Sequence, residues 1–212
     1  MIPHSTSSSG QTLIETIVAI FILTTGLASG LALAVYSFGA STDIAEQIVA
    51  TGLAREGIEA ARGKRDSNWI AGTLTDCEGE GWCYATWLNG MVGAPGNGIV
   101  YRVVFDPQSS ANKLTLDSTA YSGADHYRLY EQSGAGLSHT TTALPTNFFR
   151  KINIIYEFPG GEYEPTSPLV LVRSSVWWYG KRCNNDLTDL TDPSQTTCKI
   201  ITEEYLTNWR NY

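Results

Sequence analysis

A long apolar run near the N terminus constrains the fold of this chain more than any other feature. It extends from Gly10 to Phe38, Glu15 is its only charged residue, and no further charge follows until Asp43. About 20 apolar residues in a helix span the hydrocarbon core of a bilayer, so this run is long enough to cross with some tilt. Because a backbone in hydrocarbon must satisfy its own hydrogen bonds, we predict a transmembrane helix over about 12–38.

Glu15 is the unusual residue of this run. A carboxylate at the centre of a bilayer costs about 2.5–3.5 kcal/mol, so an ionisable residue in such a segment indicates a function and requires a partner.

The residues around Glu15 form a motif that indicates its function. Gly10-Gln11-Thr12-Leu13-Ile14-Glu15, followed at once by an apolar helix, resembles the processing site of type IV prepilins and pseudopilins. In that family a membrane-embedded prepilin peptidase cuts after the Gly of a short cytoplasmic leader and methylates the new N terminus. The resemblance implies a leader over 1–10, cleavage between Gly10 and Gln11, and Glu15 as the carboxylate that guides assembly.

Two positions depart from the family pattern. The leader has no Lys or Arg, and Gln11 stands where the family usually has Phe. Three further stretches resemble PilV-like minor pilins, namely Leu53–Arg62, Arg65–Trp69 and Leu206–Arg210.

The helix is expected to continue beyond the membrane segment and to occupy 11–65. Apolar residues recur at steps of three and four and predict one face that packs on a soluble domain. They are Ile44, Ala45, Ile48, Val49, Leu53, Ile58 and Ala61. Several glycines interrupt this helix, each at a cost of about 1 kcal/mol relative to Ala. They indicate either close packing against small residues or a helix that can bend.

The rest of the chain, 66–212, predicts a β-rich head domain that begins with a turn-rich loop to about Gly98. Strand patterns separated by turn-length gaps, without helical patterns between them, favour an antiparallel sheet packed on the first helix. The predicted strands are Ile99–Phe105, Lys113–Thr119, Tyr127–Gln132, Phe148–Phe158, Leu169–Tyr179 and Lys199–Leu206. The predicted fold class is therefore α+β, and the resemblance implies a type IV pilin-like version of it.

Four cysteines, an even number behind a membrane-export signal, indicate disulfides in an oxidising compartment. Of three possible connectivities we favour Cys77–Cys83 and Cys183–Cys198, because each pair closes a polar, turn-rich loop. Neither spacing suits a zinc site.

Patterns typical of enzymes and ligand sites are weak. Asp125-His126 and several serines supply the residue types of a catalytic triad, but no catalytic motif accompanies them. The three histidines, His4, His126 and His139, are expected at the surface. The carboxylates of Asp186, Asp189 and Asp192 are weak calcium candidates, since hard cations bind oxygen clusters.

The aromatic run Trp177-Trp178-Tyr179 offers a binding surface only in part. Neighbours in a strand point to opposite faces, so at least one of the two tryptophans is expected in the core.

The net charge of −7 argues against nucleic acid as a partner. The resemblance implies a non-enzymatic structural subunit, a minor rather than a major one, of a type IV pilus-like filament, without a cofactor. Its partners would be other pilin subunits, prepilin peptidase, and membrane lipid before assembly. It would start as a single-pass membrane precursor with an extracytoplasmic head and end in a filament at the cell surface. A pilus, a type II secretion system and a competence system remain equally compatible.

Two other classes remain as alternatives. One is a membrane-anchored binding or adhesion module whose helix is never cleaved or assembled. The other is a secreted enzyme with a conventional signal peptide, which needs a basic start and a small-residue cleavage site after the apolar run. The start here is not basic, and the apolar run leads directly into a helical pattern.

Overall fold

The computed structural model places most of the helix and the strands of this chain. It describes residues 13–71, 86–88, 91, 98–105, 114–119, 125–132, 136–139, 144–157, 169–180, 183 and 193–207. Contacts divide the chain into two compact units, Met1–Ala45 and Glu46–Tyr212.

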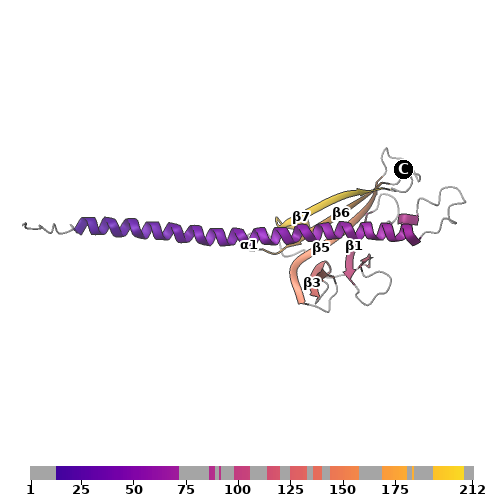
Figure 1. Ribbon diagram of the computed structural model, residues 1–212, viewed down its shortest axis with the longest axis horizontal. Helices are drawn as coiled ribbons and strands as arrows, with labels where there is room; N and C mark the ends of the chain where they lie inside the picture. The colour runs from indigo at the N-terminus through magenta and orange to yellow at the C-terminus, as the bar shows by residue number, and fades with distance from the viewer. Residues whose placement is uncertain are drawn as a thin grey trace, which may run out of the picture. The chain divides into compact units, whose positions relative to one another are not determined.

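The helix α1 (Leu13–Ala71) begins close to its predicted start and runs beyond its predicted end near Arg65 (Figure 1). Its last turns have polar partners that the local pattern does not reveal. The Asn68 amide donates to the carbonyl oxygen of Trp87 at 2.9 Å, and the Ser67 hydroxyl donates to that of Gly63. The first of these bonds ties the end of α1 to the short 3₁₀ helix η2 (Thr86–Leu88).

Seven strands form one sheet in which every pairing is antiparallel. They are β1 (Ile99–Phe105), β2 (Leu114–Asp117), β3 (Arg128–Gln132), β4 (Gly136–Ser138), β5 (Leu144–Glu157), β6 (Leu169–Trp178) and β7 (Lys199–Leu206). The order is β2-β1-β5-β3-β4, while β6 pairs with β5 and β7 with β6. A second 3₁₀ helix, η3 (Pro193–Gln195), precedes β7. The α+β arrangement of one long helix and an antiparallel sheet is confirmed.

Five of the six predicted strands lie within two residues of their predicted bounds. The exception is β5, which starts at Leu144 instead of Phe148 and includes Pro145. Pro145 lies opposite Tyr130 of β3, before the pairing with β6 begins at Phe148. A proline without an N–H fits here, because this part of β5 has a single partner strand. The three-residue strand β4 was not predicted.

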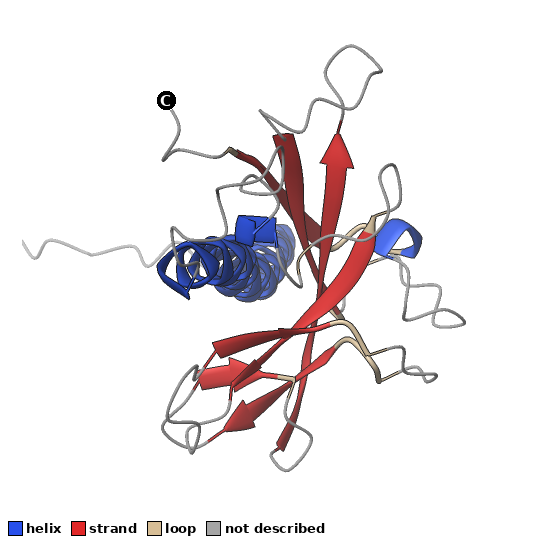
Figure 2. Cartoon of the chain, turned by 90° about the vertical axis from the view of Figure 1, so that its right-hand side faces the viewer, coloured by secondary structure: helices blue, strands red, loops and turns tan. Residues whose placement is uncertain are grey.

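The core lies between the sheet and the second half of α1, and Figure 2 shows the twisted sheet on one side of the helix. Two hydrophobic clusters fill it. The first contains Ile58, Ala60, Ala61, Trp87, Leu88, Met91, Tyr101, Val103, Ile152, Ile154, Val170, Val172 and Leu206. The second contains Ala50, Leu53, Ala54, Leu129, Val176 and Trp178. The apolar residues expected to share one face, Ile152 and Ile154 of β5 and Val170, Val172, Val176 and Trp178 of β6, are buried. Leu171, Ser175 and Trp177 are buried as well, so β6 is covered on both faces and does not show the expected alternation.

The predicted apolar face of α1 is only partly the packed face. Leu53, Ile58 and Ala61 are buried as expected, but Ile44 and Ile48 are exposed, Ile48 to 67%. Ile48 lies on the same face of the helix as Gly52, Arg55 and Glu59, which are also exposed, so this face points away from the sheet.

Gly57 marks a close approach of α1 to the sheet. A Cβ at this position would overlap the Ser174 hydroxyl and lie 3.2 Å from Ile152 Cδ1. Gly52, one turn earlier, faces open space. Close packing therefore explains the glycine at 57 but not the one at 52.

The predicted disulfide Cys183–Cys198 is confirmed, with a Cα–Cα distance of 5.4 Å. Both cysteines pack against the second cluster, so the bridge fastens the chain after β6 to the start of β7. Cys77 and Cys83 lie outside the described residues.

Candidate functional site

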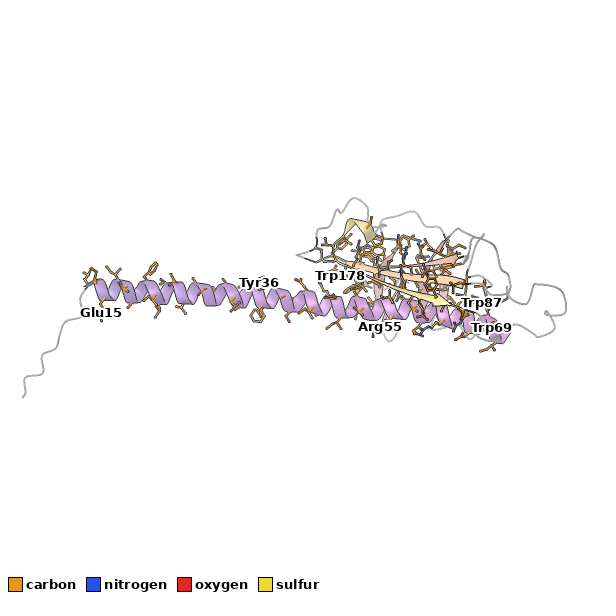
Figure 3. The ribbon with its side chains drawn as sticks, turned by 90° about the horizontal axis from the view of Figure 1, so that it is seen from above. Glu15, Tyr36, Arg55, Trp69, Trp87 and Trp178 are labelled. Carbon is orange, nitrogen blue, oxygen red and sulfur yellow. A yellow bond between two sulfur atoms is a disulfide. The ribbon has the colours of Figure 1, made fainter. Side chains whose placement is uncertain are left out.

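The first part of α1 carries a continuous apolar surface that no part of the described chain covers. Large apolar side chains between Leu13 and Phe38 are all more than half exposed. By length and composition the helix is a candidate membrane span, and the qualifying window lies near the N terminus. Figure 3 shows these side chains projecting on every side of the helix, with Glu15 labelled in its first turn.

Polar side chains within this segment bond to the helix itself. The Thr24 and Thr25 hydroxyls donate to the carbonyl oxygen of Phe21 at 3.0 and 2.8 Å, and the Ser29 hydroxyl donates to that of Gly26 at 3.0 Å. Such bonds satisfy the hydroxyl donors within the helix. They therefore lower the cost of placing these residues in hydrocarbon, where an unsatisfied donor is expensive.

Glu15 is left as the one charge of this segment. As an acidic residue in the first turn, it lies at the positive end of the helix dipole, which favours a carboxylate by about 0.3–1 kcal/mol at an exposed site. The proposed cleavage residues, Gly10 and Gln11, lie outside the described residues.

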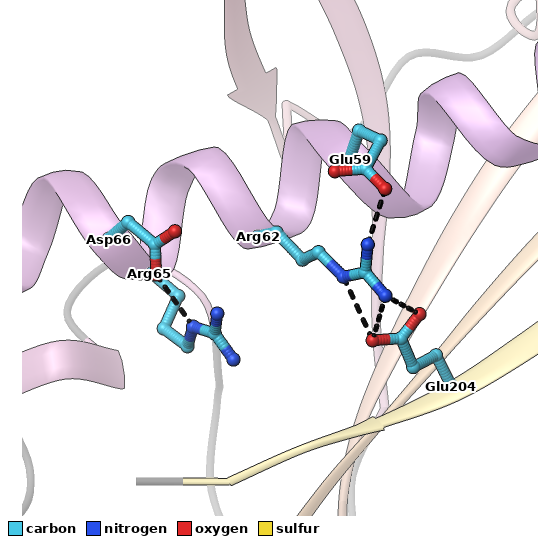
Figure 4. Close-up of polar contacts among 5 residues, drawn as sticks. All are labelled: Glu59, Arg62, Arg65, Asp66 and Glu204. Carbon is cyan, nitrogen blue, oxygen red and sulfur yellow. Dashed lines mark hydrogen bonds and ion pairs between the residues drawn. The ribbon is translucent and has the colours of Figure 1, made fainter. Parts of the chain in front are cut away.

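Ion pairs attach the second part of α1 to the sheet. Both terminal amino groups of the Arg62 guanidinium are engaged, one by Glu59 on the same helix and one by Glu204 on β7 (Figure 4). Arg62 Nε also donates to Glu204 Oε1 at 2.9 Å. Hydrogen bonds to Glu204 raise the pKa of Arg62, and they link the helix to the last strand.

A second attachment is buried. Arg150 on β5 is fully buried, and its Nη1 donates to the carbonyl oxygen of Leu53 at 3.2 Å and lies 3.3 Å from Glu56 Oε1. Burial lowers the pKa of Arg150, while the carboxylate of Glu56 opposes that effect. The sequence offered a signal for this residue, because Arg150 occupies a core-facing position in the alternation of Ile152 and Ile154.

The expectation of surface histidines is wrong for His139. Its side chain is 3% exposed, and its ring contacts the backbone of Val103 on β1 and of Arg150 on β5. Nothing in the local sequence distinguishes this residue, since its surroundings depend on strands far away in the chain. His126 is half-buried, and His4 lies outside the described residues.

The other candidate sites gain no support. Asp125 pairs with Arg128 at 2.9 Å. Trp177 and Trp178 are both buried, and Trp177 stacks on Phe149 with ring centroids 5.7 Å apart. The two tryptophans are therefore core residues rather than an exposed binding surface.

Among the residues that the structure describes, no three His, Cys, Asp or Glu side chains gather to hold a metal ion. The weak calcium candidates Asp186, Asp189 and Asp192 lie outside those residues.

Comparison of the chain with models of known protein families, with curated proteins and with solved structures found no match.

Proposed function

We propose that this chain is a structural subunit of a type IV pilus-like filament. It would be inserted in the membrane, cleaved after Gly10 and assembled through the first part of α1. The observation that carries this proposal is an exposed apolar helical segment whose only charge, Glu15, lies in its first turn.

The physical argument concerns what could neutralise that charge. Between apolar helices the effective dielectric constant is low, so a carboxylate is strongly attracted to a nearby positive charge and is costly without one. Cleavage after Gly10 creates such a charge, the α-amine of Gln11, four residues before Glu15. An amine from a neighbouring copy would pair with Glu15 and thereby set the register between subunits.

The second part of α1 suits this role because the sheet holds it firmly. Arg62, Arg150 and the close contact at Gly57 each connect the helix to a different part of the sheet. A head fixed in this way would be carried by the helix as it packs among others.

The experiment is mass spectrometry of the chain from membranes and from filaments sheared off cells that contain a prepilin peptidase. We expect a new N terminus at Gln11 in both fractions. An intact leader and absence from filaments would instead support a membrane-anchored binding module. Loss of the whole apolar stretch would support a secreted protein with a conventional signal peptide.

A further inference from the structure

The sheet contains a fork where β5 exchanges one partner strand for another. β3 pairs with β5 as far as Phe149, and β1 pairs with it from Ile152 onward. Arg150 lies at the fork, and its N–H donates to the carbonyl oxygen of Tyr127, directly before β3, at 2.8 Å.

The ring of His139 fills this fork. The pairing of Tyr101 with Ile152, continued by two residues, places Val103 opposite Arg150. A ladder continued in that register would bond the two backbones directly, but the imidazole lies between them. Val103 N lies 3.1 Å from Nδ1 of His139, and Nε2 lies 2.9 Å from the Arg150 carbonyl oxygen.

Nδ1 also lies 2.9 Å from the Val103 carbonyl oxygen, so the contacts place a proton on Nε2 but do not by themselves assign Nδ1. The Arg150 carbonyl oxygen can only accept a hydrogen bond, so Nε2 carries a proton. In the neutral ring Nδ1 has no proton and accepts the N–H of Val103 at 3.1 Å. The neutral imidazole thus replaces one ladder hydrogen bond and joins β1 to β5.

The charges that face this ring are mainly positive. Arg150 on β5 and Arg102 on β1 are its charged neighbours, and their carboxylate partners are Glu56 on α1 and Asp117 on β2. Burial, and then the charge of Arg150, lower the pKa of His139 to about 3, although the two backbone hydrogen bonds raise it. The ring is therefore neutral in the folded protein at neutral pH.

We propose that His139 is a proton-sensitive wedge that joins β1 to β5 only while its ring is neutral. A proton on Nδ1 removes the acceptor for the Val103 N–H and adds a second buried positive charge beside Arg150. The Val103 carbonyl oxygen, 2.9 Å from Nδ1, can accept the new proton, but the Val103 N–H then has no partner. The fork therefore opens on acidification, while the ladder from β5 through β6 to β7 stays closed.

The sign of the effect follows from the two pKa values. In the open fork the ring has the ordinary pKa of 6.5, and in the closed fork it has the lowered one. Closure is favoured above pH 6.5 and loses its advantage as the pH falls from there toward about 3. Between pH 7 and pH 5 the opening equilibrium should rise about 25-fold. This inference does not depend on the proposed role of α1.

The test is amide hydrogen exchange by NMR on the full chain in detergent micelles, corrected for intrinsic exchange rates. We expect the protection of the Val103 amide to fall about 25-fold from pH 7 to pH 5, while that of amides in the β6–β7 ladder changes little. His139→Gln should remove this pH dependence, and His126→Gln, a matched change of the other described histidine, should preserve it.

Two results would overturn the proposal. One is unchanged Val103 protection in the wild type between pH 7 and pH 5. The other is the same pH-dependent loss in His139→Gln. If that variant does not fold, ¹⁵N shifts of the wild-type imidazoles decide instead. A His139 ring that titrates near pH 6.5 while Val103 keeps its protection would also contradict the wedge.

Discussion

The buried guanidinium of Arg150 attaches α1 to the sheet. Its Nη1 contacts both the Leu53 carbonyl oxygen and the Glu56 carboxylate, whereas Nε and Nη2 have no hydrogen-bond partner among the residues that the structure describes. A buried guanidinium with incomplete hydrogen bonding is costly, so the fold depends on the one carboxylate that compensates it.

Replacing that carboxylate should therefore be costly. We predict that Glu56→Gln lowers the free energy of unfolding by about 1–2 kcal/mol, because it leaves the buried charge of Arg150 without a counter-ion. Glu59→Gln is the matched control on the same helix. Glu59 is 63% exposed and its partner Arg62 keeps Glu204, so this change should cost less than about 0.5 kcal/mol. Urea unfolding measures both, and equal losses would contradict the account of Arg150.

Gly57 is the second residue that fixes the helix. Gly57→Ala should lower the free energy of unfolding by about 1–3 kcal/mol, since the added methyl overlaps the Ser174 hydroxyl. Gly52→Ala places the same methyl in open space and should raise it by about 0.5–1 kcal/mol through helix propensity alone. The same urea measurements compare the two variants, and a stabilising Gly57→Ala would show that the close approach is not real.

At the scale of elements, the disulfide Cys183–Cys198 closes the connection between β6 and β7. We predict that replacing both cysteines by Ser lowers the free energy of unfolding by about 3 kcal/mol, the value expected for a loop of about 15 residues. The comparison is made by urea unfolding without reductant. An unchanged free energy of unfolding would mean that the packing of β6 against β7 alone holds this connection.

The sequence predicted most elements because their patterns are local. The β-branched and aromatic runs of β1 and β7 gave the correct bounds, whereas the alternation expected in β6 does not appear, because both faces of that strand are buried. β4 was not predicted because the three residues from Gly136 to Ser138 are too few to show an alternating pattern. The strand is recognised by its pairing with β3.

The misses share one physical cause, which is tertiary context. α1 continues to Ala71 with the help of a bond from Asn68 to the distant Trp87. Ile48 fits the helical period but lies on the face of the helix that Gly52, Arg55 and Glu59 continue, and this face stays exposed. His139 is buried because β5 changes partners beside it, and no pattern in its neighbourhood reveals that fork.

At the scale of the whole molecule, the two compact units differ in what they bury. The unit Glu46–Tyr212 holds both hydrophobic clusters, the buried Arg150 and the described disulfide. In the unit Met1–Ala45, the apolar side chains of the helix are exposed, and their hydroxyl neighbours bond to the helix itself. The unit Glu46–Tyr212 therefore contains the folded core, whereas the helix of the unit Met1–Ala45 is, by length and composition, a candidate membrane span.

The measurement that tests the central claim most directly is the distribution of Glu15 variants between membrane and sheared filaments. Glu15→Gln keeps the shape and polarity of the side chain and removes its charge. Glu15→Asp keeps the charge and shortens its reach, and Glu131→Gln makes the same chemical change at an exposed position on β3.

We predict that all three variants are inserted and cleaved. The filament fraction of Glu15→Gln should fall at least about tenfold, which corresponds to about 1.4 kcal/mol. Glu15→Asp should be intermediate, and Glu131→Gln should match the wild type. Equal incorporation of wild type and Glu15→Gln would contradict assembly through this carboxylate.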